Sequence, residues 1–349
     1  MSSLLLITAI ALIAVAIAAG LAYRARVNGP FEPTNYIWFR GLGLLCDKNG
    51  GLDFLKRQRG SRESMPLDLK AYADIQEGDL VWVRHLALPQ FAEHVLPTIN
   101  ARFGLVSGDE DWGIPSGFSD ADRILENKFL VHWFTQNYDG TDTSGKISGL
   151  PLGLDFHTVS NRRKWGHWPM TPTQQEAQLV DVVAHMPPTA TRTRLVHADF
   201  HLNKFKKQIW GEGRIQVEAV LRSNDCVYFE QRKLRRLDSW KKKTTFAFEV
   251  SPHGNGLDCL RTWESLVLGN IVIVKRSSLD PLYTGLPVVI LDDWSEITQD
   301  NLDRWLQQHA AALDDPAVQE RLTNGYWMQH MRRVMRSLMN PASRTLGDD

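Results

Sequence analysis

The chain has 349 residues, of which 43% are hydrophobic, a composition that supports two domains with buried cores. Its 40 basic and 40 acidic side chains cancel, so it lacks the net positive charge typical of nucleic-acid-binding proteins, and we expect no nucleic-acid partner. Three scattered cysteines are too few for a disulfide framework or a zinc site, which indicates a reducing compartment.

The first predicted element is a transmembrane helix. Residues 4–22 are uncharged and aliphatic apart from Thr8 and Gly20, and their number matches the roughly 20 residues that span a bilayer. We assign residues 1–28 to a single-pass membrane anchor. A cleaved signal peptide is the alternative, although the basic n-region is missing. Arg24 and Arg26 directly follow the span, so the positive-inside rule places the rest of the chain in the cytoplasm, with the Golgi lumen as the alternative.

Residues 29–185 are predicted to form a first α/β lobe. Apolar runs predict strands that alternate with helices, in the order strand 80–83, helix 91–103, strand 103–106, helix 120–127 and strand 129–133. This alternation is typical of a parallel sheet.

Polar residues follow these predicted strands. Functional groups of parallel sheets gather at the carboxyl ends of the strands. Asp109, Glu110 and Asp111 come directly after one strand, and Asp155 and His157 lie in a later loop. Each of the five can act as a general base that removes a proton. Asp109 is favoured because its loop ends a clear strand. The alternative is that these residues lie in solvated turns.

A second lobe is predicted over residues 186–297, after a linker rich in Trp and Pro at 163–194. Residues 193–196 predict the first strand of its sheet, and we expect the loop 197–203 to face the cleft between the lobes. The basic run 232–243 predicts a long amphipathic helix with most of its cations in solvent. Helices at 299–313 and 316–338, within the segment 298–349, are expected to brace the two lobes.

The stretch 246–294 is the most informative part of the chain. It predicts a strand, the glycine loop Ser-Pro-His-Gly-Asn-Gly, a helix from about Asp258, and a buried strand after Gly269. Such loops bind phosphates with exposed backbone N–H groups at a helix N-terminus. The helix is predicted to bury Cys259, Trp263, Leu266 and Val267. The opposite side is predicted to carry Asp258, Arg261 and Ser265.

Twelve residues of this stretch stand in the order found in the exostosin-like glycosyltransferases, which the chain resembles here. They are Pro252, Gly254, Gly256, Asp258, Arg261, Trp263, Glu264, Gly269, Leu286, Pro287, Asp293 and Trp294. The resemblance implies two Rossmann-like lobes in the GT-B arrangement. It also implies that a sugar donor binds at the glycine loop and helix, through His253, Gly254, Asn255, Gly256, Asp258, Arg261 and Glu264.

Glu264 is the residue of this set with the sharpest expected role. It lies two turns into a helix that begins at the glycine loop, where its carboxylate can accept hydrogen bonds from ribose hydroxyls. The alternative is a surface ion pair with Arg261, three residues before it.

The sequence therefore predicts a membrane-anchored, inverting glycosyltransferase of polysaccharide biosynthesis. It would transfer a sugar from a nucleoside diphosphate sugar to a hydroxyl of a glycan or a lipid-linked acceptor. No cofactor and no metal is expected, because cations can hold the diphosphate; the candidates are Lys204, Lys206, Lys207, Arg222, Arg232 and Arg236. A metal at residues 109–111, as in single-lobed GT-A enzymes, is the discounted alternative.

Two other classes of protein compete with this interpretation. One is a nicotinamide-dependent α/β enzyme, which is disfavoured because the chain lacks the G-x-G-x-x-G fingerprint. The other is a catalytically silent sugar-binding or scaffold protein with the same fold.

Overall fold

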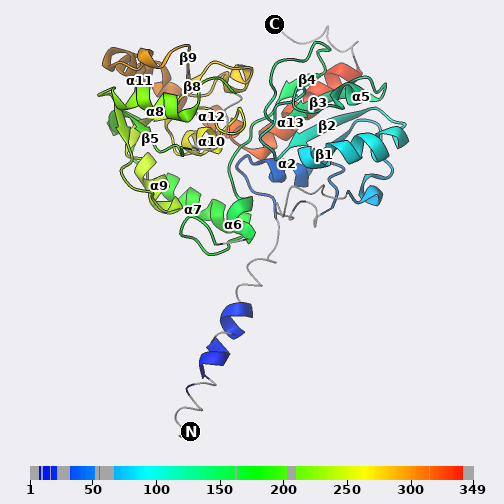
Figure 1. Cartoon of the computed structure of the whole chain (residues 1–349), viewed down its shortest axis with the longest axis horizontal. Coiled ribbons are helices and arrows are strands. Elements are labelled where there is room, and N and C mark those ends of the chain that lie inside the picture. Colours follow the sequence, from blue (N-terminus) through cyan, green and yellow to red (C-terminus); the bar gives the residue numbers. More distant parts are fainter. Residues whose placement is uncertain are drawn as a thin grey trace.

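The computed structural model describes residues 8, 11–15, 17–21, 32–51, 55, 67–161, 163–202, 210–313 and 315–340. Within these residues the chain forms two lobes, each built on a parallel sheet with flanking helices (Figure 1). The predicted α/β class with two parallel sheets is confirmed.

The sheet of the first lobe has four parallel strands among the described residues, in the order β1-β2-β3-β4. They are β1 (Asp79–Arg84), β2 (Phe103–Gly108), β3 (Leu130–Thr135) and β4 (Ile147–Gly149). Almost every residue of the first three strands is buried, as expected where both faces of a sheet are covered. The short strand β4 was not predicted.

Short helices precede β1 and connect β1 to β2 and β2 to β3. They are α2 (Phe39–Leu45), η1 (Leu69–Tyr72), η2 (His85–Ala87), α4 (Leu88–Gln90), η3 (Phe91–Val95), η4 (Leu96–Thr98) and α5 (Ala121–Leu125). The single helix predicted at 91–103 is therefore a series of short turns. Pro89 and Pro97 lack the backbone N–H that a continuous helix requires. Helices α6 (His157–Asn161) and α7 (Pro172–Ala184) lead to the second lobe.

The sheet of the second lobe has five parallel strands among the described residues, in the order β6-β5-β7-β8-β9. They are β5 (Thr193–Ala198), β6 (Val227–Phe229), β7 (Phe246–Val250), β8 (Ile271–Lys275) and β9 (Val288–Leu291). The chain starts in β5, adds β6 on one side and then continues from β7 on the other. The order of the strands thus reverses between β5 and β7.

The helical segments of this lobe and of the C-terminal part are η5 (Thr189–Thr191), α8 (Arg214–Arg222), α9 (Arg236–Lys243), α10 (Leu260–Val267), η6 (Asp280–Tyr283), η7 (Trp294–Glu296), α11 (Gln299–Leu313), α12 (Pro316–Arg321) and α13 (Asn324–Met339). The helix predicted at 232–243 is shorter than expected, and the helix predicted at 316–338 is two helices. Thr323 caps the second of them by accepting the N–H of Tyr326.

The C-terminal helix α13 lies on the first lobe, although it follows the second lobe in sequence (Figure 1). The Asn324 side chain donates to the carbonyls of Thr34 and Tyr36 at 2.9 and 2.8 Å and accepts the N–H of Trp38. Farther along the helix, Arg332 forms an ion pair with Asp47 at 2.6 Å. These contacts hold the C-terminal helix α13 against the first lobe.

Asp258, just before α10, joins the two lobes. Its carboxylate accepts the backbone N–H of Leu152 in the first lobe and the indole N–H of Trp263 in its own lobe, both at 2.8 Å. The backbone N–H of Asp258 donates to the side chain of Asn137, again in the first lobe, at 2.8 Å. Gly256 permits this approach, because a Cβ at that position would lie 2.8 Å from the Asn137 amide nitrogen.

The predicted anchor, residues 4–22, lies partly outside the described residues. Residues 11–15 and 17–21 are helical and exposed. Across the described parts of the chain, we find no helix whose length and apolar content would let it cross a membrane. The anchor therefore stays a prediction from sequence.

The buried Asp258 should make stability depend on pH. Burial raises the pKa of this carboxyl to about 6, above the value of about 3.9 expected in an unfolded chain. Between these values the folded state binds more protons than the unfolded state, so the contribution of Asp258 to stability falls as the pH rises. The test measures the free energy of unfolding in urea at about pH 4 and pH 7. Between these two values it should fall by about 3 kcal/mol more in the parent chain than in Asp258→Asn, which lacks the titrating carboxyl.

The matched control is Asp225→Asn, because Asp225 is an exposed carboxylate. This variant should keep the pH dependence of the parent chain. Equal slopes for the parent and Asp258→Asn would contradict the burial of a titrating carboxyl between the lobes.

Candidate functional site

A cavity of 460 Å³ is lined by residues that follow β5 and β6 and by residues of α9 and α10. β5 is one of the two strands between which the strand order of the second sheet reverses. Open parallel sheets bind their ligands in the crevice at such a reversal. The wall includes Asp155 from the first lobe, together with Asp199, Arg236, Lys243, Arg261 and Glu264 from the second. We call it the larger cavity. Asp199 and its neighbours fulfil the expectation that the loop after residue 197 faces the cleft.

A cluster of paired charges lies beside this cavity. Asp199 accepts the Nε–H of Arg261 at 2.8 Å and lies 3.5 Å from the ammonium of Lys243. Glu249, fully buried on β7, accepts from Lys243 at 3.1 Å and is 2.6 Å from Nδ1 of His197. Burial alone would raise the pKa of Asp199, but Lys243 and Arg261 bring it well below its ordinary value. The carboxylates of this cluster are thus neutralised by side-chain cations.

The same cluster is a candidate for a metal site. Ligand atoms of His197, Asp199 and Glu249 lie within 4.8 Å of one another. Both carboxylates, however, already contact Lys243 or Arg261, and a divalent ion would meet two positive charges at once. The donor set therefore fits a metal poorly.

Arg261 and Glu264 project toward the larger cavity from α10. The predicted buried residues of this helix are buried, but the opposite face is covered too: Ser265 is fully buried, and Arg261 is 12% exposed. Arg261 and Ser265 lie opposite the buried face as predicted, but the side chains of Asp199 and Lys243 contact them there. Glu264 pairs with Arg236 at 3.2 Å instead of Arg261 and remains 18% exposed.

The glycine loop makes fewer N–H groups available than expected. Gly254 N–H donates to the carbonyl of Gly256 at 3.0 Å. The carbonyls of Pro252 and His253 accept from the guanidinium of Arg214, which braces the loop from α8. Of the predicted donor set, Arg261 and Glu264 line the larger cavity and His253 lines a second, smaller cavity. Gly254, Asn255, Gly256 and Asp258 line neither of the two. The loop therefore mainly connects β7 to α10, and its carbonyl groups are held by Arg214.

Asp109 is held by two arginines. Its carboxylate lies 3.0 Å from Arg40 and 2.6 Å from Arg84, and both guanidinium groups are buried. Burial would raise the pKa of Asp109, but the two cations bring it far below its ordinary value, which weighs against this residue as a base. Neighbouring Glu110 and Asp111 are half-buried, and neither lines the larger cavity.

Asp155 and His157 form a second pair in the first lobe. Nδ1 of His157 lies 3.0 Å from Oδ1 of Asp155, and the same oxygen accepts the backbone N–H of Thr158 at the start of α6. Burial lowers the pKa of His157 despite the nearby carboxylate of Asp155, so the imidazole is neutral near pH 7. Burial opposes ionisation of Asp155, but His157 and Arg236 lower its pKa. A neutral, 29% exposed imidazole oriented by a carboxylate is suited to accept a proton.

Some site residues were missed or cannot be placed. Of the cations predicted to bind a diphosphate, Arg222, Arg232 and Arg236 line the larger cavity, whereas Lys204, Lys206 and Lys207 fall outside the described residues. The sequence reasoning overlooked Glu249 and Lys243. The charge of Glu249 within the apolar run Phe246–Val250 was the available signal, because a lone carboxylate in a buried strand requires a partner.

Comparisons with known proteins give the following result. No protein-family model and no curated protein sequence matches the chain. Among solved structures, an α,α-trehalose-phosphate synthase from Burkholderia vietnamiensis is 13% identical over 79% of this chain and 75% of that one, with a TM-score of 0.40. The catalytic domain of starch synthase IV from Arabidopsis thaliana, bound to ADP and acarbose, is 11% identical over 75% and 73%, with a TM-score of 0.34.

The spinosyn rhamnosyltransferase SpnG, complexed with thymidine diphosphate, is 10% identical over 76% of this chain and 72% of that one, with a TM-score of 0.31. Two of the three are named as synthases and the third as a transferase. At these identities and TM-scores the likeness assigns no activity to this chain. Its function has to be argued from its own residues.

Proposed function

We propose that the chain is an inverting, exostosin-like glycosyltransferase that uses a nucleoside diphosphate sugar as its donor. The observation that carries this proposal is the composition of the larger cavity. It places Glu264, the residue that the sequence resemblance assigns to donor binding, in the same cavity as Asp155, the partner of His157. One cavity thus contains a donor-binding candidate and the residue that orients a base.

The second lobe supplies the groups for the nucleotide. Arg222, Arg232, Lys233 and Arg236 line the larger cavity. Arg222 and Arg236 are paired with Glu218 and Glu264, so Arg232 and Lys233 are the cations that can compensate the charge of a diphosphate. Glu264 is partly exposed and already oriented by Arg236, so its second oxygen can accept ribose hydroxyls. The donor then needs no metal, because its charge is met by side chains.

The first lobe supplies the base. In an inverting transfer, one group removes the proton of the acceptor hydroxyl as the oxygen attacks the anomeric carbon and the nucleoside diphosphate departs. His157 is neutral and oriented by Asp155, so we assign the base to His157 and a positioning role to Asp155. Asp109, Glu110 and Asp111 are given no catalytic role, because Asp109 is neutralised by arginines.

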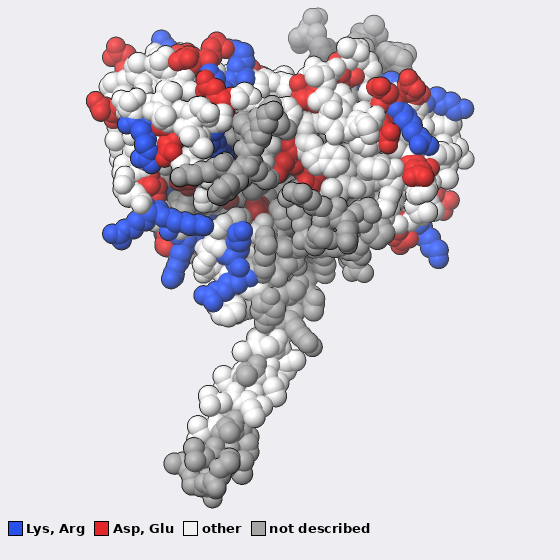
Figure 2. All heavy atoms as spheres, viewed as in Figure 1, with Lys and Arg blue, Asp and Glu red and all other residues white. Residues whose placement is uncertain are grey.

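We also propose that residues 4–22 anchor the chain in a membrane with the two lobes in the cytoplasm. The charge distribution supports a nearby anionic surface. Lys and Arg side chains gather along the lower edge of the left-hand lobe in Figure 2, the lobe that carries α9. Exposed Arg163, Lys164 and Lys241 belong to the segments before α7 and within α9. Such cations can contact anionic headgroups.

Glu264→Gln tests the donor site. Removing the charge while keeping the shape should weaken the binding of the preferred nucleoside diphosphate by about tenfold or more, since hydrogen bonds to a charged acceptor are worth about 1.5–3 kcal/mol. Calorimetric titration gives the affinity, after a thermal-shift panel selects the nucleotide. The matched control is Glu320→Gln, an exposed carboxylate outside the cavity. Unchanged affinity in Glu264→Gln would remove this residue from the site.

His157→Ala tests the base. The rate of sugar transfer should fall by about 10²- to 10⁴-fold, while nucleotide affinity changes little, because His157 is not among the residues that line the larger cavity. The rate of the parent enzyme should also fall as the pH drops through the pKa of His157, and the variant should lose this limb. His185→Ala, at an exposed histidine, should behave as the parent. Transfer at the parent rate in His157→Ala would assign the base elsewhere.

Deletion of residues 1–26 tests the anchor. Because the described part of this segment is exposed, the shortened chain should keep the cooperative melt and the nucleotide affinity of the full chain and move from the membrane fraction to the soluble fraction. Sedimentation of a cell lysate measures the distribution. Loss of the melt would show that the segment belongs to a folded core, and retention in the membrane fraction would contradict its role as the anchor.

A further inference from the structure

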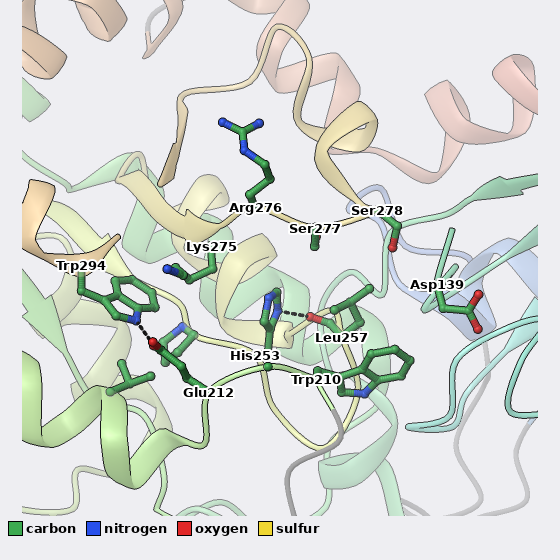
Figure 3. Close-up of a pocket in the computed structure, with 13 residues that line it drawn as sticks. Asp139, Trp210, Glu212, His253, Leu257, Lys275, Arg276, Ser277, Ser278 and Trp294 are labelled. Carbon is green, nitrogen blue, oxygen red and sulfur yellow. Dashed lines mark hydrogen bonds between the residues drawn. The ribbon is translucent and has the colours of Figure 1, made fainter. Parts of the chain in front are cut away.

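A second cavity, of 300 Å³, lies at the carboxyl ends of β7, β8 and β9 (Figure 3). We call it the smaller cavity. Its wall includes Asp139 from the first lobe and Trp210, His253, Lys275 and Trp294 from the second. His253 and Leu257 face this cavity, whereas Leu260 and Arg261 face the larger one. The two cavities therefore lie on either side of the start of α10.

Two fixed indole rings form part of the wall. Trp210 donates its indole N–H to the carbonyl of Asn255 at 3.1 Å, and its ring lies against Gly113, where a Cβ would come within 2.3 Å of it. Trp294 donates its indole N–H to Glu212 at 2.9 Å (Figure 3). The Trp294 ring is only 2% exposed, and the Lys275 ammonium lies 5.6 Å from its centroid. The more exposed Trp210 ring, fixed by its hydrogen bond, therefore offers the flat apolar surface, at a low cost in conformational entropy. The C–H face of a sugar ring is a suitable partner for such a surface.

Hydrogen-bonding groups complete the wall. Nδ1 of His253 is 2.8 Å from the carbonyl of Leu257, to which it donates, so Nε2 is an acceptor (Figure 3). Burial lowers the pKa of His253, which keeps the ring neutral near pH 7. Lys275 has three N–H donors, of which the carbonyl of Asp292 takes one. The hydroxyl of Ser278 donates to the carbonyl of Tyr138 at 2.6 Å and can accept a further hydrogen bond.

The charges that line the smaller cavity balance. Lys275 and Arg276 supply two cations, and Asp139 and Glu212 supply two carboxylates. Arg276 is also paired with Asp292 at 2.6 Å, outside the lining residues. A diphosphate would face two carboxylates here with no excess of positive charge, whereas the wall of the larger cavity has six cations and five carboxylates. Donors, acceptors and aromatic rings with no net charge suit an uncharged ligand rich in hydroxyls.

We propose that the smaller cavity binds an uncharged hexose ring. This inference rests on the proposed function, in which the ring belongs to the acceptor. Asp139 brings the first lobe into the wall, so the ring would contact both lobes, as the acceptor and donor sites of one reaction require. An acceptor with several sugar residues can then hold one ring in the smaller cavity while another presents its hydroxyl at the larger cavity. The acceptor class is accordingly a neutral oligosaccharide.

The test measures hexoside and nucleotide binding by the same full-length chain. Saturation-transfer NMR with methyl glucoside, methyl galactoside and methyl mannoside should show binding of at least one of them. Trp210→Ala and Lys275→Met should each weaken that binding by about tenfold. The matched control is Trp168→Ala, because the ring of Trp168 is 55% exposed and lies outside the cavity. Binding of uridine, guanosine or adenosine diphosphate should be unchanged in all three variants.

The outcomes separate this inference from the proposed function. A parent chain that binds a nucleotide but none of the hexosides contradicts the hexose site alone. Hexoside binding that is equally strong in both cavity variants contradicts it as well, because the ring must then bind elsewhere. Hexoside binding that is sensitive to the variants, in a chain that binds no nucleotide, supports the site and contradicts the proposed donor. If Trp210→Ala fails to fold in a melting experiment, Lys275→Met decides the result.

Discussion

The Asp258 carboxylate holds the two lobes in one arrangement. It accepts one N–H from the first lobe and two from the second, counting the backbone N–H of Cys259 at 2.7 Å. A buried carboxylate without such partners would be costly, so the three bonds and the position of the lobes depend on one another. The joint sits directly before α10. It therefore fixes the helix that carries Arg261 and Glu264 relative to Asp155 across the cleft.

Pairs of opposite charges also fix the wall of the larger cavity. The buried Lys243 and the largely covered Arg261 are balanced by Asp199 and Glu249, and this cluster packs beneath the more exposed cations at the rim. Breaking a buried pair leaves an uncompensated charge and costs about 3–5 kcal/mol. The rim residues Arg232 and Lys233 are exposed and carry no comparable constraint. Under the proposed function, the buried cluster positions the site and the rim supplies affinity for an anionic donor.

Local patterns predicted the sheets well because burial on both faces leaves a long apolar run. The strands around Val81, Leu105, Phe248 and Ile273 were recognised in this way. The three-residue strands β4 and β6 have too few residues to show a period. Their existence follows from pairing with β3 and β5, which only the folded chain defines.

The site was less predictable because its partners are distant in sequence. In the sequence Asp109 is a plausible base, because nothing nearby shows that Arg40, 69 residues earlier, contacts its carboxylate. Arg261 sits on the polar side of its helix, and no local pattern shows that Asp199, 62 residues earlier, meets it there. Glu264 lines the larger cavity, but the glycine loop that was expected to bind the diphosphate beside it does not. The sequence therefore predicts local structure, such as buried strands, better than it predicts which side chains meet from distant parts of the chain.

The central claim is that the larger cavity binds a nucleoside diphosphate. A crystal structure of the chain with the nucleotide that most raises its melting temperature tests this claim directly. The account predicts the diphosphate beside the rim cations Arg232 and Lys233 and the ribose hydroxyls on Glu264. A nucleotide bound instead among Trp210, His253 and Trp294 of the smaller cavity, or away from both cavities, would contradict it.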